Sequence, residues 1–246
     1  NTRVADIAAN TRLLTNLTNT ANLAWTGTGS ENLNSNQTSI AIVEPTIAQT
    51  KSNNRSASGA APDQTVTYTL TTTNTAGANV SAANDTIITD TVPLGVTPVD
   101  GSNNPLADGA VVPGTGGNAT WNSTTREIKN ATGLTILPGS NVVWTYNVKV
   151  DNPSIGGASK VNSAVVTTTS INGSDPNERT VASTPHVGYN ASSTSTFRIG
   201  STTVTKVQSA PITVPANRAT IGEQITYTSV VTIPAGIDIY DQTIVD

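Results

Sequence analysis

The sequence predicts an all-β protein made of tandem β-sandwich repeats. Three observations carry this prediction: stretches in which apolar and polar residues alternate strictly, clusters of turn-forming residues between them, and a long segment that occurs twice. Strict alternation places the apolar side chains on one face of a strand, and short strands separated by regularly spaced turns are typical of sandwiches.

Two stretches show the alternation most clearly. In 64–70, Val66, Tyr68 and Leu70 share one face and threonines occupy the other. In 142–150, one face carries five apolar residues: Val142, Trp144, Tyr146, Val148 and Val150. A half-buried strand needs this pattern, so we expect both stretches to be core strands.

Turn clusters rich in Gly, Pro, Asn and Ser separate the predicted strands, at 56–59, 100–105 and 113–117. Such residues accept the backbone angles of tight turns. The stretch from Val4 to Leu17 has only a weak helical period, and we assign it to strand or coil. We therefore expect no amphipathic helix.

Composition excludes several classes of function. With 12 basic and 16 acidic residues the net charge is -4, which provides no basic stripe for nucleic acid. The absence of cysteine removes disulfides, zinc fingers and thiol catalysis, and we expect no cofactor or metal. No run of 18 apolar residues could span a membrane. Because the chain starts at Asn1 without a signal peptide, we expect a piece of a longer exported protein.

Internal repetition divides the chain. The segment 47–90 recurs as 203–246, so that Lys51 corresponds to Lys206, and the run 162–166 resembles 19–23. We therefore expect the C-terminal part of one repeat at 1–45, a complete repeat at 46–189, a linker at 190–202 and the N-terminal part of a third repeat at 203–246.

The runs VTYTLT (66–71), TNTAG (73–77) and ITDTVPLGV (88–96) resemble a known family, the tandem immunoglobulin-like repeats of prokaryotic surface proteins. This is the DUF11 or isopeptide-forming fimbrial repeat, with a pattern close to VTYTLTVTNTG…VTDTLPAGV. The resemblance covers the middle unit well and the flanks partly. Pro62-Asp63 departs from the usual Gly-Asp, and TIPAG at 232–236 replaces the usual turn. The resemblance implies tandem immunoglobulin-like β-sandwich repeats in an extracellular protein of the cell surface.

Three polar residues of the middle unit fall on apolar strand faces. Asp90 lies between Ile88 and Val92 at the spacing of one face, and Lys51 and Asn162 also share parity with apolar residues. Such groups are normally avoided in a core. The partial repeats carry equivalents on apolar faces, whose partners would lie outside this chain: Asn19, Lys206 and Asp246.

A buried amine and a carboxamide in contact can condense to a new amide with loss of ammonia. Burial lowers the pKa of a lysine and raises that of a carboxyl group, so Lys51 would be a nucleophile and a protonated Asp90 could polarise the Asn162 carbonyl. The resemblance implies such a Lys-Asn isopeptide bond between the first and last strands. Lys51 and Asn162 are then the cross-link residues and Asp90 is the catalytic acid. This single self-modification would not make the chain an enzyme.

A plainer interpretation stays open, in which Lys51 protects a sheet edge and Asp90 caps a turn. Other candidates have weaker support: His186 is expected to be a loop residue, and no known calcium-loop spacing joins Asp85, Asp90, Asp100 and Asp108. Trp25, Trp121 and Trp144 could be considered a platform for stacking on sugars, but Trp144 faces the core by parity, and core packing is the better interpretation. Asn-x-Ser/Thr triplets, for example at Asn84, Asn118 and Asn190, are potential glycosylation sites.

We therefore expect a structural segment of a surface fibre, stalk or sheath, whose partners are neighbouring repeats or copies of itself. The alternative is an adhesin module that binds a glycan or host protein through loops such as Val99 to Trp121. A carboxylate-based hydrolase is the least favoured hypothesis, because the acidic residues are scattered.

Overall fold

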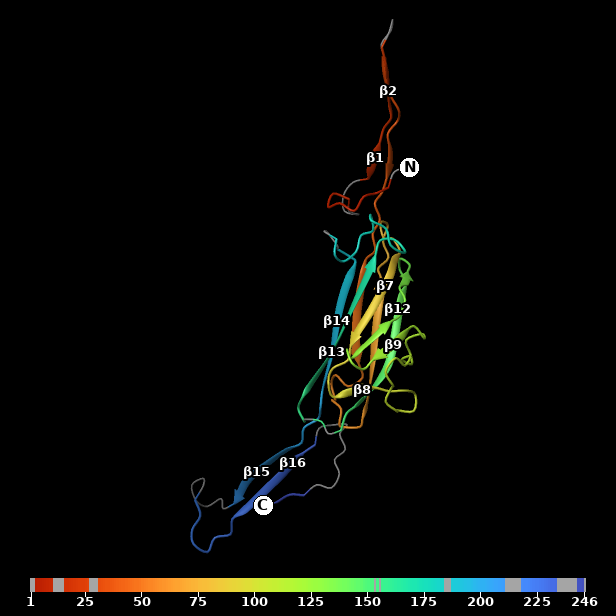
Figure 1. Ribbon diagram of the computed structural model, residues 1–246. Helices are drawn as coiled ribbons and strands as arrows, with labels where there is room; N and C mark the ends of the chain where they lie inside the picture. Colours follow the sequence, from red (N-terminus) through yellow and green to blue (C-terminus); the bar gives the residue numbers. More distant parts are fainter. Residues whose placement is uncertain are drawn as a thin grey trace.

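The computed structural model describes residues 3–10, 16–26, 31–152, 154, 156–183, 187–210, 218–233 and 243–245. These residues contain strands and no helix. The predicted fold class is confirmed: the chain is all-β, and its centre is an immunoglobulin-like β-sandwich. Figure 1 shows an elongated arrangement with the sandwich in the middle and two-stranded hairpins beyond both of its ends.

Two sheets form the sandwich. The first has the order β5-β6-β12-β8, with β5 at Ile47–Asn53, β6 at Thr65–Asn74, β12 at Asn141–Val150 and β8 at Val96–Pro98. The second has the order β14-β13-β7-β10-β9, with β11 also paired to β7. Its strands are β7 (Ala83–Thr91), β9 (Ala119–Asn122), β10 (Glu127–Asn130), β11 (Leu134–Ile136), β13 (Ser159–Thr169) and β14 (Asn190–Arg198).

Both strands that the sequence indicated most clearly lie side by side in the first sheet. In β6 every second residue is buried, and β12 pairs with it in antiparallel register, with Tyr68 opposite Tyr146 and Leu70 opposite Trp144. The alternating pattern is confirmed, because the inner faces of the two sheets supply the core. The largest fully buried side chains include Trp144, Tyr68, Tyr146 and Ile88.

The chain enters the sandwich at one end and leaves it at the other. At the entry end the backbone of Ile47 donates to the carbonyl of Gly188 at 3.1 Å; at the exit end Ala60 donates to Arg198 at 2.9 Å. Strands β5 and β14 therefore run in the same direction along one edge. Asn53 of β5 donates to Ser195 of β14 at 2.6 Å, which joins the two sheets at this edge.

The predicted linker at 190–202 requires a correction. Residues Asn190–Arg198 form β14, which pairs with β13 over nine positions, and Phe197 and Ile199 lie in the core. The run of serines and threonines concealed the strand, because small polar residues at its outer positions and at the buried Ser195 gave no apolar alternation.

The flanking segments form hairpins. Toward the N-terminus, β1 (Leu17–Asn19) pairs with β4 (Thr38–Ile40), and β2 (Asn22–Trp25) pairs with β3 (Glu31–Asn34). Toward the C-terminus, β15 (Thr203–Ala210) pairs with β16 (Thr226–Thr232). Within the described ranges no second sheet covers these hairpins, which is why their apolar side chains, such as Leu23 and Val204, are exposed.

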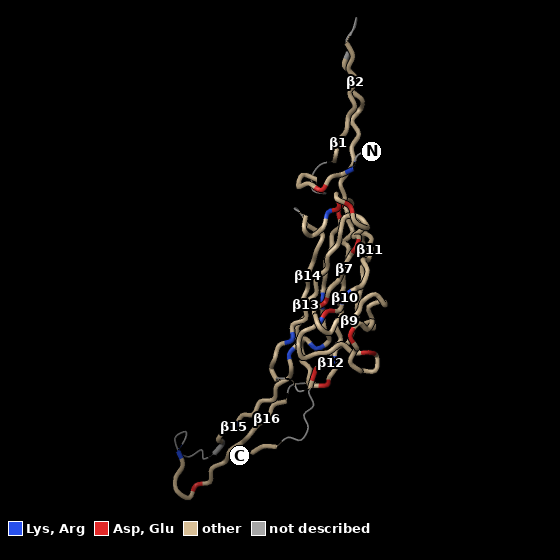
Figure 2. The backbone as a smooth tube through the Cα atoms, viewed as in Figure 1, with Lys and Arg blue, Asp and Glu red and all other residues tan. Residues whose placement is uncertain are grey.

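Charged residues are sparse along the whole backbone, as the predominance of tan in Figure 2 shows. In the parts of the chain that the structure covers, no helix is long and apolar enough to cross a membrane.

Candidate cross-link site

The structure brings Lys51, Asp90 and Asn162 together between the two sheets. Asp90 in β7 pairs with Ala164 in β13, so Asn162, two residues away on the same face, is its diagonal neighbour. Lys51 reaches this point from β5 of the opposite sheet, and its Nζ contacts Oδ2 of Asp90. Asn162 belongs to the strand before the last one, since β14 follows β13 and completes the sandwich. The first-to-last pairing that the resemblance implied is therefore wrong for this unit.

Tyr146 is a fourth member of the site that sequence reasoning treated only as a core residue. Its hydroxyl lies 3.2 Å from Nζ of Lys51, donates to Oδ2 of Asp90 at 2.7 Å, and accepts from Nδ2 of Asn162 at 2.7 Å. A buried tyrosine hydroxyl normally needs a polar partner, and that requirement was the available signal. Tyr146 thus connects all three predicted residues.

The site is dry. The side chains of Lys51 and Asp90 are 0% exposed, and Asn162 is 0% exposed as a whole residue. Aromatic rings surround the amine, with Nζ of Lys51 lying 5.0 Å from the ring centre of Tyr68 and 5.4 Å from that of Tyr146. A charged lysine in such surroundings loses its hydration without full compensation.

Burial moves both ionisable groups toward their neutral forms. It lowers the pKa of Lys51, although the charge and hydrogen bond of Asp90 act in the opposite direction. It raises the pKa of Asp90 against the effects of Lys51, Tyr146 and Asn162. Burial and the nearby Asp90 also raise the pKa of Tyr146, which keeps its proton. The environment thus favours a neutral amine beside a protonated carboxyl group.

Two buried acceptors at the site lack a donor among the described residues, namely Oδ1 of Asp90 and Oδ1 of Asn162. Leaving a buried polar atom unpaired costs about 1 to 3 kcal/mol. A proton on the Asp90 carboxyl group would convert one of these acceptors into a donor. The unpaired atoms therefore agree with a protonated Asp90.

A second Lys-Asp-Asn group lies on the surface and provides an internal comparison. Nζ of Lys149 lies 2.9 Å from Oδ1 of Asp63, and Nδ2 of Asn152 donates to Oδ2 of the same carboxylate at 2.6 Å. The side chains of Lys149 and Asp63 are 35% and 53% exposed. The same three residue types therefore occur here in contact with water, whereas Lys51, Asp90 and Asn162 are enclosed between the sheets.

The equivalents in the flanking segments are not in comparable surroundings. Asn19 and Lys206 are exposed on hairpins, and Nζ of Lys206 lies 4.7 Å from the ring centre of Tyr227. Asp246 lies outside the described residues. The expected apolar face is not buried at these positions, because the hairpins lack a covering sheet in the described part of the chain.

Besides Asp90, the carboxylates that were considered for calcium accept hydrogen bonds from other parts of the protein or from their own turn. Asp100 accepts from the backbone of Ser102 and Asn104, Asp108 accepts from Ser123, and Asp85 accepts from the backbone of Gly173. Over the described ranges no three metal-binding side chains gather into one group. His186 lies outside the described residues.

Two of the three tryptophans are buried, and the segment 99–121 is held by hydrogen bonds to itself and to β12. Trp144 and Trp121 are buried, whereas Trp25 is 41% exposed on β2. The core position predicted for Trp144 is confirmed.

Inside 99–121, the backbone amide of the buried Val112 donates to the carbonyl of Ala119 at 2.9 Å, and the carbonyl of Gly114 accepts from the amide of Thr145 of β12 at 2.9 Å. Of the potential glycosylation sites, Asn118 and Asn190 are exposed and Asn84 is half-buried.

Comparisons with known proteins return structural likenesses only. No family model and no curated protein sequence matches the chain. A type II cohesin domain from the cellulosome of Acetivibrio cellulolyticus is 10% identical, with coverage of 62% of this chain and 95% of that chain and a TM-score of 0.38. BcpA, the major pilin subunit of Bacillus cereus, is 10% identical, with coverage of 66% of this chain and 42% of that chain and a TM-score of 0.36.

The T6 backbone pilin of serotype M6 Streptococcus pyogenes is 14% identical, covering 70% of this chain and 38% of that chain, with a TM-score of 0.37. This chain therefore spans less than half the length of either pilin.

Proposed function

We propose that this chain is a structural segment of an extracellular prokaryotic surface fibre, stalk or sheath, built from tandem immunoglobulin-like repeats of the DUF11 or isopeptide-forming fimbrial type. In this proposal the middle repeat is locked by an isopeptide bond between Lys51 and Asn162. The observation that carries it is the dry cluster of Lys51, Asp90, Asn162 and Tyr146 between the sheets. Neighbouring repeats or further copies of the chain are its partners.

The reaction balances without any added reagent. The neutral amine of Lys51 attacks Cγ of Asn162 while a proton on Asp90 stabilises the oxygen of the carboxamide. The bond from Nζ to Cγ forms, the bond from Cγ to Nδ2 breaks, and Nδ2 leaves as ammonia after receiving a proton that the amine releases. Asp90 ends with the proton it began with. The chain undergoes this reaction once and is not an enzyme with turnover.

Two features of the site support this chemistry. Lys51 and Asn162 both lie within hydrogen-bond distance of the Tyr146 hydroxyl, so Nζ and Nδ2 are separated by no more than the sum of those two distances, 3.2 Å and 2.7 Å. Burial also moves the pKa of Lys51 down and that of Asp90 up, toward the protonation states that the attack requires.

The position of the bond suits a load-bearing element. The chain enters through β5, which carries Lys51, and leaves at the opposite end of the sandwich. Without a covalent bond, tension between the two ends acts on hydrogen-bonded strands and on the contacts between sheets. A bond from Lys51 to Asn162 transfers the tension from β5 to β13 of the other sheet.

Intact-mass measurement of the purified chain tests the proposal. The mass should be lower than the sequence mass by one ammonia, and Lys51→Ala or Asp90→Ala should restore the sequence mass. Lys149→Ala is the matched control, because it removes the lysine of the exposed Lys-Asp-Asn group and should leave the ammonia deficit unchanged. Peptide mapping should find residues 51 and 162 in one branched peptide. A wild-type mass equal to the sequence mass would disprove the cross-link.

A further inference from the structure

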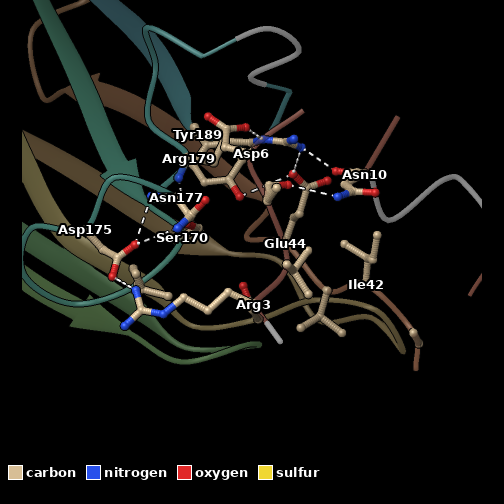
Figure 3. A pocket seen from close by; sticks show the side chains of 16 residues that line it. Arg3, Asp6, Asn10, Ile42, Glu44, Ser170, Asp175, Asn177, Arg179 and Tyr189 are labelled. Carbon is tan, nitrogen blue, oxygen red and sulfur yellow. Dashed lines mark hydrogen bonds and ion pairs between the residues drawn. The ribbon is translucent and has the colours of Figure 1, made fainter. Parts of the chain in front are cut away.

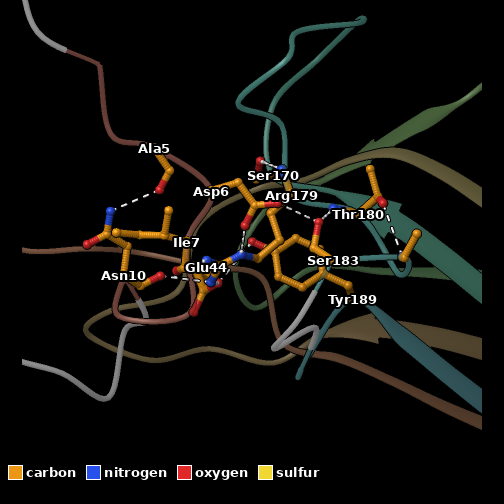
Figure 4. Close-up of polar contacts among 11 residues, drawn as sticks. Ala5, Asp6, Ile7, Asn10, Glu44, Ser170, Arg179, Thr180, Ser183 and Tyr189 are labelled. Carbon is orange, nitrogen blue, oxygen red and sulfur yellow. Dashed lines mark hydrogen bonds and ion pairs between the residues drawn. The ribbon is translucent and has the colours of Figure 1, made fainter.

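Another charged cluster, whose side chains are drawn in Figure 4, lies at the entry end of the sandwich and shares no residue with the cross-link site. Its centre is Arg179, in the connection between β13 and β14, which is only 5% exposed. A buried arginine is costly unless its donors are satisfied and its charge is paired. The partners of Arg179 therefore indicate what the loop is built to hold.

Most of these partners come from the N-terminal segment 3–10, far away in sequence. Arg179 donates to Oδ1 of Asp6 at 2.6 Å and to the backbone carbonyls of Ile7 and Asn10, each at 2.8 Å. It also donates to Oε1 of Glu44 at 2.6 Å, where the chain enters the sandwich. One guanidinium group thus binds both the N-terminal segment and Glu44, which precedes β5.

Further contacts reinforce this attachment. Ser183 donates to Oδ2 of Asp6 at 2.6 Å, and Arg3 pairs with Asp175 in the same connection between β13 and β14. Figure 3 shows Arg3, Asp6, Asp175 and Arg179 at a pocket of about 510 Å³, which is lined mainly by segment 3–10, residues 41–44 and the β13–β14 connection. The segment thus contacts the sandwich at several separate points.

The repeat pattern identifies which part of a neighbouring unit this segment represents. Asn19 resembles Asn162, and 3–10 precedes Asn19 by the same interval as 146–153 precedes Asn162. In the middle unit, that stretch contains the end of β12 and leads into a turn at the exit end, where Gly157 donates to Ile199. Segment 3–10 therefore corresponds to the exit end of a preceding unit.

We propose that the Arg179 cluster is the joint between successive repeats, in which the β13–β14 connection of one unit binds the exit end of the unit before it. This inference rests on the tandem-repeat fibre of the proposed function and names the surface through which its units contact each other. The partner is the exit end of the preceding unit, recognised by the carboxylate of Asp6 and by the backbone carbonyls of Ile7 and Asn10. The joint fixes how one sandwich is oriented on the next.

The electrostatics agree with a closed joint at neutral pH. Burial would raise the pKa of Asp6, but hydrogen bonds from Ser183 and Arg179 and the charge of Arg179 lower it further than burial raises it. The other charged or titratable groups at this surface are Glu44, Arg3, Asp175 and Tyr189. A carboxyl group with a lowered pKa stabilises the contact above the ordinary Asp pKa and loses this effect as pH falls through its own value.

Hydrogen exchange of the whole chain, followed by mass spectrometry, tests the joint. The amides of Ile7 and Asn10 bond within the segment that Arg179 holds, to the carbonyls of Ala5 and Ile7. Arg179→Ala should accelerate exchange in the peptide covering 4–10 by roughly 10- to 100-fold, the factor expected on losing a hydrogen bond to a charged group. Asp6→Ala should have a similar effect, and it leaves the pair of Arg179 and Glu44 in place.

Lys149→Ala, at the opposite end of the sandwich, is the matched control and should leave exchange in 4–10 unchanged. Unchanged exchange in Asp6→Ala would overturn the joint, as would acceleration in the control equal to that in the Arg179 variant. The intact mass of each variant reports the cross-link separately. An ammonia deficit together with unchanged exchange in Asp6→Ala refutes the joint alone, whereas accelerated exchange with no ammonia deficit refutes the cross-link alone.

Discussion

Replacing both charged residues of the buried cluster by apolar ones separates a covalent cross-link from an ordinary ion pair. In the double variant Lys51→Met, Asp90→Leu the new side chains resemble the old ones in size and need no hydrogen bonds. Asn162 and Tyr146 keep their mutual hydrogen bond of 2.7 Å. The two interpretations then predict opposite signs for the change in the free energy of unfolding.

A buried ion pair replaced by apolar residues of similar volume leaves stability unchanged or raises it by about 1 to 4 kcal/mol. A bond between Lys51 and Asn162 instead closes a loop of roughly 110 residues, whose loss returns about 4 to 5 kcal/mol of chain entropy to the unfolded state. For a domain of this size the corresponding decrease in melting temperature is roughly 10 to 20 °C.

Urea denaturation and calorimetry at neutral pH measure this difference, with intact mass recorded for each sample. Lys149→Met on the exposed pair is the control and should change the free energy of unfolding by less than about 1 kcal/mol. A double variant as stable as the wild type, or more stable, would refute the argument that the cluster contributes a covalent bond.

Three further predictions follow from the same structure. In Lys51→Met alone, Asp90 keeps its proton in the folded state to higher pH than in the unfolded state; stability should then fall above the ordinary Asp pKa by up to about 1.4 kcal/mol per pH unit. Urea denaturation at several pH values should show no such decrease in the double variant, which lacks Asp90. The same pH dependence of the free energy of unfolding in both variants would contradict the raised pKa of Asp90. Single-molecule stretching should release mainly the chain after Asn162, on the order of 100 Å, because β14 lies outside the closed loop; opening of the whole sandwich would contradict the bond. Gly114→Ala should lower the melting temperature far more than Gly117→Ala, because both have positive φ but only the former directs a Cβ into a carbonyl of β12, and equal losses would contradict the anchoring of that segment.

Local pattern was sufficient for the fold class and for the burial of the site residues of the middle repeat. Alternation with a period of two determines which side chains face inward, so Val66, Tyr68 and Trp144 were recognisable as core without any tertiary information. The same parity indicated that Asp90 and Asn162 would face inward, as they do. The pattern failed for β14, where serine and threonine hide the periodicity and pairing with β13 decides the structure.

The sequence pattern did not predict which side chains contact each other between the two sheets. Parity states which way a side chain points but not which strand lies opposite, so the meeting of Lys51 and Asp90, and the Tyr146 hydroxyl between them, depend on strand order and sheet packing. The attachment of Asp6 to Arg179 likewise joins residues that are 173 positions apart in the sequence. The sequence alone determined the alternating core strands, such as β6 and β12, and their inward faces, because these depend on near neighbours. Only the tertiary structure decided the partners, because they depend on how distant strands pack.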